Sequence, residues 1–340
     1  MEILFFSRGR GRGHAIPDVG ILTELKAIRP TLNCELVSYA IGARTIESLG
    51  ERVIDLGLPE ENPFLETLIK AATIIENRKP QLVVAHEEPA AVLASKVFGI
   101  PSVFITDWFM KETSILMQSL SYAQRVIFLE APAIFDEPSF LRNRVKYMGS
   151  FLRNFTYSKS DRNLARHELA IDLNTFVVSV LPGGWATEIK APALDLILTA
   201  FDRLQFGSKL LLWVAGSDYE DLRDRTSTRN DIRIYQQSWP IERVMVASDV
   251  IVTKNNRGTT LEAAQLGIGS LSLSHGLNPV EDYIVPRIRS NLSLRIKGLD
   301  SAFLATCVEQ QALKTKDLSP SLDSTVSARS IANEIVTSLA

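Results

Sequence analysis

The feature that most constrains the fold is a regular alternation of short apolar runs with amphipathic stretches of helical period. Apolar runs rich in Val, Ile and Phe are expected to form strands at 3–6, 34–39, 82–85, 102–105 and 126–129. Amphipathic helices are expected between several of them, at 18–28, 63–77 and 90–98. Continuously apolar strands joined by helices are typical of a parallel sheet covered on both faces. The first half therefore predicts a doubly wound α/β domain.

The alternation breaks once and then restarts, which indicates a second domain of the same kind. The stretch 147–161 has Gly, Asn, Ser and Lys without periodicity and is typical of a linker. Later strands and helices are expected at 176–181, 191–204, 209–215, 232–235, 250–253, 259–266 and 270–274. A length of 340 residues also favours two domains. We expect Rossmann-like domains over 1–148 and 162–323, a linker over 149–161 and a closing helix over 324–340.

Two such domains are expected to form a cleft between the carboxyl ends of their strands, because ligands of open α/β sheets bind there. The informative residues should therefore lie just after strands.

Composition narrows the class of protein. The formal net charge of −2 argues against a nucleic-acid partner, since such proteins carry a basic excess. Cys34 and Cys307 lie far apart in apolar contexts and are expected to be reduced core thiols. The apolar run after Met1 is too short for a signal peptide, and no apolar segment approaches the roughly 20 residues of a membrane span. We expect a cytoplasmic protein without a transmembrane segment, for which peripheral membrane contact stays open.

A glycine-rich loop follows the first expected strand and ends in a histidine. Gly9, Gly11 and Gly13 lack the spacing of a dinucleotide fingerprint, and no acidic residue follows the second strand to bind a ribose. No cofactor is therefore expected. Glycines let the backbone approach a ligand closely, and His14 would stand at the start of the next helix. The alternative is a surface loop whose histidine only caps that helix.

Two loops of the second half follow strands in the same way. Gly183 and Gly184 are expected to cradle a phosphate, although a glycine pair after a strand is also a common turn. A helix expected to begin near Thr259, just after Gly258, would offer amides and hydroxyls to an anion. Glu262, in its first turn, would accept hydrogen bonds from a diol or simply complement the helix dipole.

The segment 232–282, with its Asp249, polar loop, helix and closing pair of acids, resembles the nucleotide-sugar-binding half of GT-B glycosyltransferases. Within that fold it resembles especially the MurG family and the plant secondary-metabolite glycosyltransferases. The resemblance implies that Glu262 binds the ribose hydroxyls of UDP. It also assigns the diphosphate to Gly258, Thr259 and Thr260, the uracil ring to Gln237, Ser238 and Trp239, and the donor sugar to Glu281 and Asp282.

The N-terminal half is similar to the same family in its Gly-x-Gly-His loop, in GIPSV at 99–103 and in KYMGSF at 146–151. In many members the loop histidine deprotonates the acceptor, which assigns that role to His14 and places Gly13 beside the substrate. The chain departs from the pattern at Asn256, where glycine is usual, and at Gly269, where proline is usual. Family members often have glutamine at the position that Asp282 occupies in this chain, so the identity of the donor sugar stays open.

Sugar transfer needs a proton acceptor and a stabilised leaving group. A neutral histidine suits the first task, and its orienting carboxylate is expected to be Asp107 or Glu88, narrowly ahead of Glu87. Each of these acids would otherwise only cap the helix that follows it. For the leaving group there is no Asp-x-Asp motif or His/Cys cluster to hold a metal, so helix N-termini are expected to stabilise the diphosphate.

Lys254 or Arg257 would assist the leaving group, and Asn255 is expected at the same donor site. The sequence thus predicts an inverting, metal-independent hexosyltransferase that takes a nucleotide sugar, with UDP as the expected nucleotide.

Three other functions stay open on the same fold. One is a nucleotide-sugar hydrolase, in which the histidine activates water. The second is an epimerase, a class that brings several acids and histidines around the sugar, whereas this chain has four histidines in all. The third is a nucleotide-binding protein without catalysis.

The acceptor is a hydroxyl compound of unknown identity. Trp108, Phe109, Met110 and Met117 would either receive an apolar acceptor or pack in the core. His275 follows the expected strand 270–274. It would either contact the sugar or be an ordinary loop residue without a role in binding.

Overall fold

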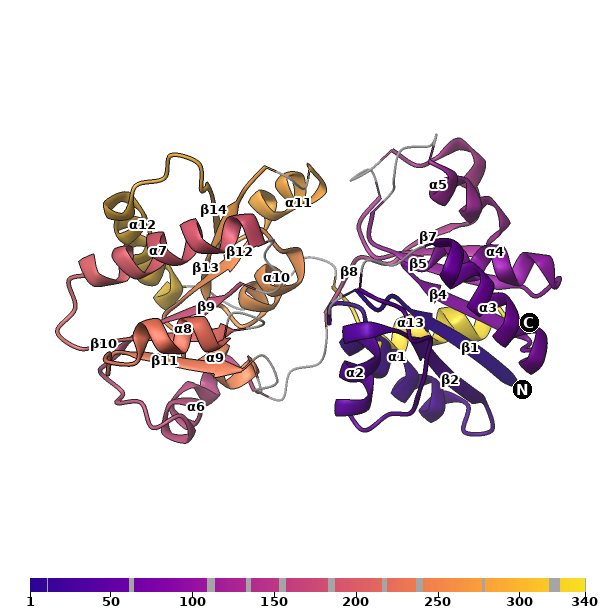
Figure 1. The fold of residues 1–340 in the computed structure, drawn as a ribbon, viewed down its shortest axis with the longest axis horizontal. Helices are drawn as coiled ribbons and strands as arrows, with labels where there is room; N and C mark the ends of the chain where they lie inside the picture. Colours follow the sequence, from indigo (N-terminus) through magenta and orange to yellow (C-terminus); the bar gives the residue numbers. More distant parts are fainter. Residues whose placement is uncertain are drawn as a thin grey trace. The chain divides into compact units, whose positions relative to one another are not determined.

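The computed structural model describes residues 1–10, 12–60, 64–108, 114–132, 136–152, 157–182, 187–215, 219–236, 241–276, 279–317 and 325–339. The chain divides into two compact units (Figure 1). Unit 1 comprises Met1–Asn154 with Ser324–Ala340, and unit 2 comprises Phe155–Asp323. The closing helix is therefore part of unit 1, although it follows unit 2 in the sequence.

Unit 1 is built on a parallel sheet that, over its described residues, has seven strands in the order β3-β2-β1-β4-β5-β6-β7. The strands are β1 (Glu2–Ser7), β2 (Asn33–Ser38), β3 (Val53–Asp55), β4 (Leu82–His86), β5 (Ser102–Thr106), β6 (Arg125–Phe128) and β7 (Val145–Tyr147). The helices are α1 (Ala15–Ile28), α2 (Ala40–Ser48), α3 (Phe64–Arg78), α4 (Pro89–Val97), α5 (Ile115–Ser119) and α13 (Ala328–Thr337). Short 3₁₀ helices lie at Leu120–Tyr122 and Ser139–Leu141.

Unit 2 repeats this architecture with a parallel sheet whose described strands run β11-β10-β9-β12-β13-β14. The strands are β9 (Phe176–Leu181), β10 (Lys209–Ala215), β11 (Ile232–Gln236), β12 (Val250–Lys254), β13 (Gly269–Ser274) and β14 (Asn291–Arg295). The helices are α6 (Arg162–Glu168), α7 (Thr187–Arg203), α8 (Tyr219–Thr226), α9 (Ile241–Ala247), α10 (Arg257–Gln265), α11 (Pro279–Ile284) and α12 (Ser301–Asp317). Short 3₁₀ helices lie at Lys159–Asp161 and Val285–Arg287.

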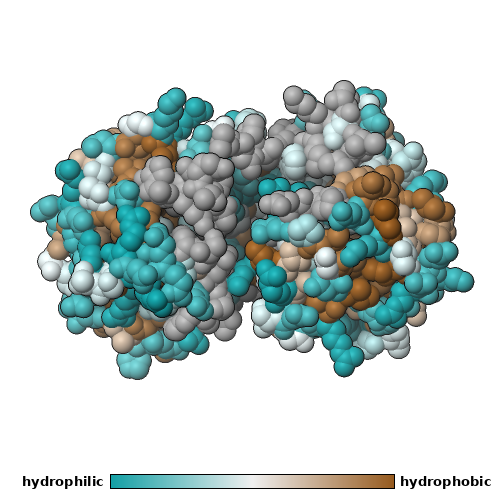
Figure 2. Space-filling model, viewed as in Figure 1, coloured by the Kyte–Doolittle hydropathy of each residue, from teal (hydrophilic) through white to brown (hydrophobic). Residues whose placement is uncertain are grey.

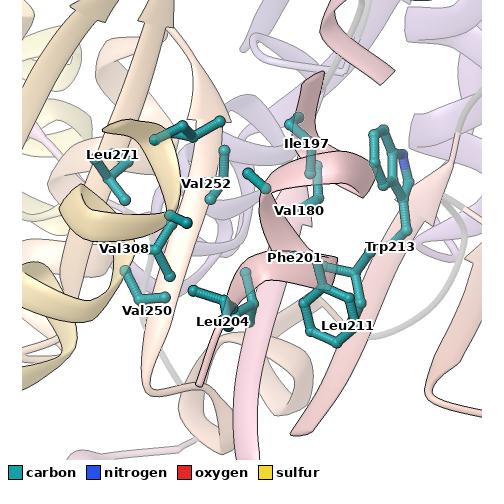
Figure 3. Packing of buried hydrophobic residues seen from close by; sticks show 14 of the residues in the cluster. Val180, Ile197, Phe201, Leu204, Leu211, Trp213, Val250, Val252, Leu271 and Val308 are labelled. Carbon is teal, nitrogen blue, oxygen red and sulfur yellow. The ribbon is translucent and has the colours of Figure 1, made fainter. Parts of the chain in front are cut away.

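The α/β class with two Rossmann-like domains is confirmed. The central strands are buried along almost their whole length, as continuous apolar runs predict for a sheet with two covered faces. In unit 2 one face packs Val180, Val252 and Leu271 of the sheet against Phe201 of α7 and Val308 of α12 (Figure 3). The strands that periodicity missed in unit 1, β3 and β7, are edge strands of only three residues, and their burial is partial.

The end of the chain returns to the start of unit 1. Helix α13 packs on α1, where Ile331 and Ile335 join Ile21 and Leu25 in one buried cluster (Figure 1). The strand β15 (Thr325–Val326), just before α13, pairs with β8 (Ser150–Phe151). The apolar spacing of the last segment thus covers one face of the first sheet.

Hydrophobic residues gather on the visible face of unit 1, whereas hydrophilic residues dominate that of unit 2 (Figure 2). The exposed large side chains of unit 1 include Leu65 and Ile69 of α3 and Val97 of α4. Among the described residues, none of the helices combines the length and apolarity that crossing a lipid bilayer demands.

Candidate functional site

The strand orders locate the place in each unit where a ligand site is expected. A site in an open parallel sheet lies beyond the carboxyl ends of the strands where the order reverses. In unit 1 this point lies between β1 and β4, and in unit 2 it lies between β9 and β12. The residues that follow these four strands are therefore the first candidates in the whole chain.

His14 begins α1, directly after the glycine loop that follows β1. It is the N-cap residue by position, but its side chain makes no capping hydrogen bond. Its Nδ1 is buried and has no hydrogen-bond partner among the described residues. Burial, followed by the charges of His86 and Arg8, lowers the pKa of His14 well below the usual value. The interpretation that this histidine only caps the helix therefore lacks the bond it requires.

His86 ends β4 and packs against His14. The two rings meet edge to face, with centroids 4.8 Å apart and an interplanar angle of 87°. On its other side, Nδ1 of His86 lies 2.6 Å from Oδ1 of Asp18, a fully buried carboxylate in the first turn of α1. Burial alone lowers the pKa of His86, but Asp18, with Glu87 and Asp107 nearby, raises it above the usual value.

Glu87 follows His86 and is tied to the end of β5. Its carboxylate accepts hydrogen bonds from the Thr106 hydroxyl and, at 3.2 Å, from the indole nitrogen of Trp108. Arg8 lies 3.8 Å from the same carboxylate. Burial and the neighbouring Asp107 raise the pKa of Glu87. The backbone of Glu87 has a φ of 54°, a conformation that costs about 1 kcal/mol or more outside glycine and clusters at functional sites.

The two carboxylates that the sequence favoured as partners of His14 have other neighbours in the structure. Glu88 is buried and accepts a hydrogen bond of 3.3 Å from the hydroxyl of Tyr39, although it makes no side-chain cap for α4. Asp107 lies close enough to His86 and Glu87 to raise the pKa of both. Both acids belong to this edge of the sheet, but the ring beside His14 is that of His86.

The glycines of the opening loop have different surroundings. A Cβ added to Gly9 would lie 2.2 Å from the carbonyl oxygen of Tyr39, so no larger residue fits there. A Cβ added to Gly13 would meet no atom within 4 Å. Gly11 lies outside the described residues. Packing therefore requires glycine at position 9 but not at position 13.

In unit 2, helix α10 begins two residues earlier than the sequence predicted. Asn256 is its N-cap, and its side-chain oxygen accepts a hydrogen bond of 3.0 Å from the amide of Thr259. Asparagine is among the best N-cap residues, because it pairs an amide that the helix leaves open. The expectation of a start near Thr259 was wrong, since it overlooked this cap at a position where the resemblance expects glycine.

The closing pair of acids on α11 meets the residues that precede and begin α10. Glu281 accepts a hydrogen bond of 3.0 Å from the backbone amide of Arg257, the first helical residue. Asp282 accepts one of 2.6 Å from the side-chain amide of Asn255 and another from the hydroxyl of Ser274. These acids therefore lie at the N-terminus of α10, where the helix dipole favours negative charge.

Some of the other donor residues predicted in unit 2 lie within the described residues and some lie outside them. Thr260 is buried and donates to the carbonyl of Asn256 at 2.7 Å, while Gly258 is exposed and Lys254, Thr259 and Glu262 are half-buried. Burial lowers the pKa of His275, against the charge of Asp282. Gly183, Gly184, Gln237, Ser238 and Trp239 lie outside the described residues, as do Phe109 and Met110. Met117 is buried in the core of unit 1.

Asp249, which is part of the family resemblance, and Gly269, which departs from it, both have structural roles in this chain. Asp249 accepts hydrogen bonds from Arg166 at 2.9 Å and from the backbone amide of Val177 at 2.8 Å, and it also pairs with Arg162. Gly269 donates its amide to Thr315 at 2.7 Å, and an added Cβ would lie 2.7 Å from the carbonyl of Gln311. A proline at position 269 would lack that donor and clash with α12, which explains why glycine stands there.

Sequence reasoning did not single out Asp18 or His86. The expected helix 18–28 begins at Asp18 and His86 directly follows the expected strand 82–85, but neither side chain was assigned a role. A signal was present: Asp18 lies in the helix that follows β1 and His86 ends β4, so both belong to the carboxyl edge at the switch point.

Comparison with known proteins identifies the fold. No protein-family model matches this chain. Lipid-A-disaccharide synthase 1 of Legionella pneumophila is 27% identical over 269 residues, which cover 72% of this chain and 68% of the relative.

Solved structures of similar fold include glycosyltransferases and an epimerase. The glycotransferase of kitacinnamycin has a TM-score of 0.69 at 13% identity, covering 100% of this chain and 99% of that one. MurG of Acinetobacter baumannii has a TM-score of 0.64 at 11% identity, over 99% of both chains. The UDP-GlcNAc 2-epimerase of Methanocaldococcus jannaschii has a TM-score of 0.65 at 11% identity, over 99% and 100%. These likenesses confirm the GT-B fold that the sequence resemblance implied.

Proposed function

We propose that this chain is a glycosyltransferase that moves a sugar from a nucleotide donor, a UDP sugar, to a hydroxyl acceptor. The observation that carries the proposal is the pair of switch-point sites. One places a half-buried histidine of lowered pKa at a helix start, and the other places paired acids and amides at the start of α10. The glycosyltransferases of the same fold support it.

Unit 1 would supply the proton acceptor. In the transfer, the imidazole of His14 takes the proton from the acceptor hydroxyl as its oxygen bonds to the anomeric carbon. A histidine that stays neutral at physiological pH is available for this step, and its lowered pKa keeps it in that form. Asp107 and Glu88 would belong to the same site. Asp107 would act through its neighbours His86 and Glu87, and Glu88 through its hydrogen bond with Tyr39.

Unit 2 would hold the donor. Glu262 of α10 would bind the ribose, and the first turn of α10, with Gly258, Thr259 and Thr260, would face the diphosphate. Gly183 and Gly184 would add amides there, and Ser238 and Trp239 would hold the base. Asn255, Glu281 and Asp282 would contact the sugar, and Lys254 would assist the departure of the diphosphate with the electron pair of the broken bond.

Direct displacement at the anomeric carbon inverts its configuration. The sequence has no Asp-x-Asp motif, so we propose that helix amides and Lys254 neutralise the leaving group and that transfer proceeds without an added metal. Product anomer analysis tests inversion, and transfer rates with and without a chelator test the metal requirement.

The experiment that tests donor binding is a thermal-shift panel of UDP, GDP and dTDP sugars on the full chain. Ligands that bind only the folded state raise its melting temperature by mass action. We expect a UDP sugar to give the largest shift and then to be consumed when acceptor alcohols are screened. The proposal fails if none of these donors raises the melting temperature.

A second candidate is an epimerase or hydrolase of nucleotide sugars. It is favoured by the gathering of two histidines with Asp18, Glu87 and Asp107 at one sheet edge, because such enzymes need several acids and bases around one sugar. The UDP-GlcNAc 2-epimerase of the same fold also supports this second candidate function. Release of free sugar from the donor alone, or exchange of its ring hydrogens with D₂O, without stimulation by any alcohol would favour this function over transfer.

A further inference from the structure

Three side chains form a continuous series at the switch point of unit 1, of which Asp18 and His86 are buried and His14 is half-buried. Asp18 binds Nδ1 of His86 at 2.6 Å, and the ring of His86 stands edge to face on the ring of His14 at 4.8 Å. Asp18 is fully buried and His86 is 5% exposed. A buried carboxylate bonded to an imidazole fixes both the orientation and the protonated form of that ring.

We propose that Asp18 and His86 are positioning residues for His14. Asp18 holds the site's positive charge on His86, and that charge keeps His14 an uncharged proton acceptor whose ring is fixed by the edge-to-face contact. The inference rests on the proposed role of His14 and names the residues that act through it. The carboxylate in this series comes from α1 and not from the loops after β4 and β5.

The charged groups around the two rings are consistent with this division. Arg8, from the loop after β1, adds a second positive charge near His14 and so opposes its protonation. Asp18 from α1, Glu87 after β4 and Asp107 after β5 all favour the protonated form of His86. Two imidazoles in contact cannot both be charged without repulsion, so the proton rests on the ring with the carboxylates.

The sign of each effect follows from these surroundings. His14, with its pKa lowered, stays neutral as the pH falls below the usual value of 6.5. His86, with its pKa raised, stays charged as the pH rises above that value. Removing the charge of Asp18 should therefore move the two titrations toward each other.

The test is a pH titration of the imidazole NMR signals of the full chain. The chain has four histidines, so single His→Gln variants assign every signal. In the wild type we expect His86 to titrate at a higher pH than His14. In Asp18→Asn we expect the His86 midpoint to fall and the His14 midpoint to rise toward the range of an ordinary histidine. Asp55→Asn, which removes an exposed carboxylate at the end of β3, is the matched control and should move neither.

Two results would overturn the inference. One is a wild-type titration in which His14 takes up its proton at a higher pH than His86, a measurement that needs no variant to fold. The other is a folded Asp18→Asn protein in which both midpoints stay where they were.

An activity measurement separates this inference from the proposed function. If His14 is the base, its protonation sets the acidic limb of the pH profile of kcat/KM. With the His14 midpoint raised to about 6.5, Asp18→Asn should lower kcat/KM of donor turnover about tenfold at pH 5.5 and little at pH 8.5. If Asp18→Asn moves the NMR midpoints but not the acidic limb of kcat/KM, Asp18 and His86 still position His14, but His14 is not the base. If the acidic limb moves and the NMR midpoints do not, the positioning role of Asp18 and His86 is wrong.

Discussion

The two sheet edges that carry the candidate sites differ in the source of their polarity. In unit 1 the edge is built from ionisable side chains, with two histidines and several carboxylates perturbing one another. In unit 2 the edge is the start of a helix, where Glu281 meets a backbone amide and Asp282 meets an amide side chain and a hydroxyl. The same Rossmann-like frame thus presents ionisable side chains at the sheet edge of one unit and hydrogen-bonded acids at a helix N-terminus in the other.

This difference predicts how substitutions should divide between the units. A change at the unit 1 edge should alter the turnover rate and its pH dependence, because the proposed function places the proton acceptor there. A change at the unit 2 edge should alter donor affinity, because the proposed function assigns hydrogen bonds to the donor there in both ground and transition states.

The largest effect is expected from His14→Gln. The variant keeps a polar side chain but loses the base, so kcat should fall by about 10³-fold while the donor still binds. Turnover measured beside the donor-induced thermal shift would show this separation. His275→Gln, in unit 2, is the matched histidine control, and an equal loss of kcat in both variants would contradict the division between the units.

The next effect concerns stability and is expected from Asp249→Ala. Arg166 has a side chain only 3% exposed, and without Asp249 its charge would stay buried with one fewer partner. Breaking such a buried pair costs about 3 kcal/mol of unfolding free energy. Urea denaturation would measure it.

Asp202→Ala is the control for that experiment. Asp202 pairs with Arg229, but its side chain is 53% exposed, so its removal should change stability by less than about 1 kcal/mol. Equal losses in both variants would mean that the Asp249 network is no more structural than a surface pair.

The fold was predictable from the sequence because both sheets are central, buried and parallel. Strands such as 82–85 and 209–215 are continuous apolar runs, and each appears within a residue of its expected limits. The missed strands β3, β7 and β14 are only partly buried, so their residues carry no strong apolar pattern. Helix α10 began earlier than expected because a single capping side chain, Asn256, sets its start.

The candidate site was predictable only as a set of loops. Strand ends placed His14, Glu88 and Asp107 at one edge, but which side chains touch depends on helix and strand register that spacing alone does not give. Asp18 is the clearest case, since a carboxylate in the first turn of an amphipathic helix usually complements the helix dipole. Only the packing of α1 against β4 shows that it bonds His86.

A smaller effect should separate the glycines of the opening loop. Gly9→Ala would force its new methyl group against the carbonyl of Tyr39 and should cost about 2 kcal/mol of stability. Gly13→Ala meets open space and should leave stability within about 0.5 kcal/mol. If Gly13 lies beside the substrate as the family resemblance implies, its variant should instead raise KM, and an unchanged KM would remove Gly13 from the site.

Donor affinity should respond to Glu281→Ala in unit 2. Losing a carboxylate that accepts hydrogen bonds costs about 1.5 kcal/mol, so the donor KM should rise about tenfold with kcat little changed. Glu220→Ala, on the exposed face of α8, is the matched control and should leave KM unchanged. A fall in kcat without a rise in KM would place Glu281 in the chemical step and blur the contrast between the units.

The smallest effect is a pair of opposite pH slopes within unit 1. Because the folded state keeps His14 neutral, the unfolded chain takes up a proton first as the pH falls below 6.5, and stability contributed at this position is lost on acidification. His86 behaves oppositely, since its raised pKa stabilises the fold below 6.5 and that stability is lost as the pH rises through the folded value. A difference of one bound proton between the folded and unfolded states changes the folding equilibrium constant by at most about tenfold per pH unit. Hydrogen exchange of the β1 and β4 amides at pH 5 and pH 7.5 should therefore distinguish the two residues. Compared with the wild type, His14→Gln should lose less protection on acidification, and His86→Gln should lose more. Slopes of the same sign in both variants would mean that the two rings are not held in opposite charge states, and the contrast between the two sheet edges would lose its electrostatic basis.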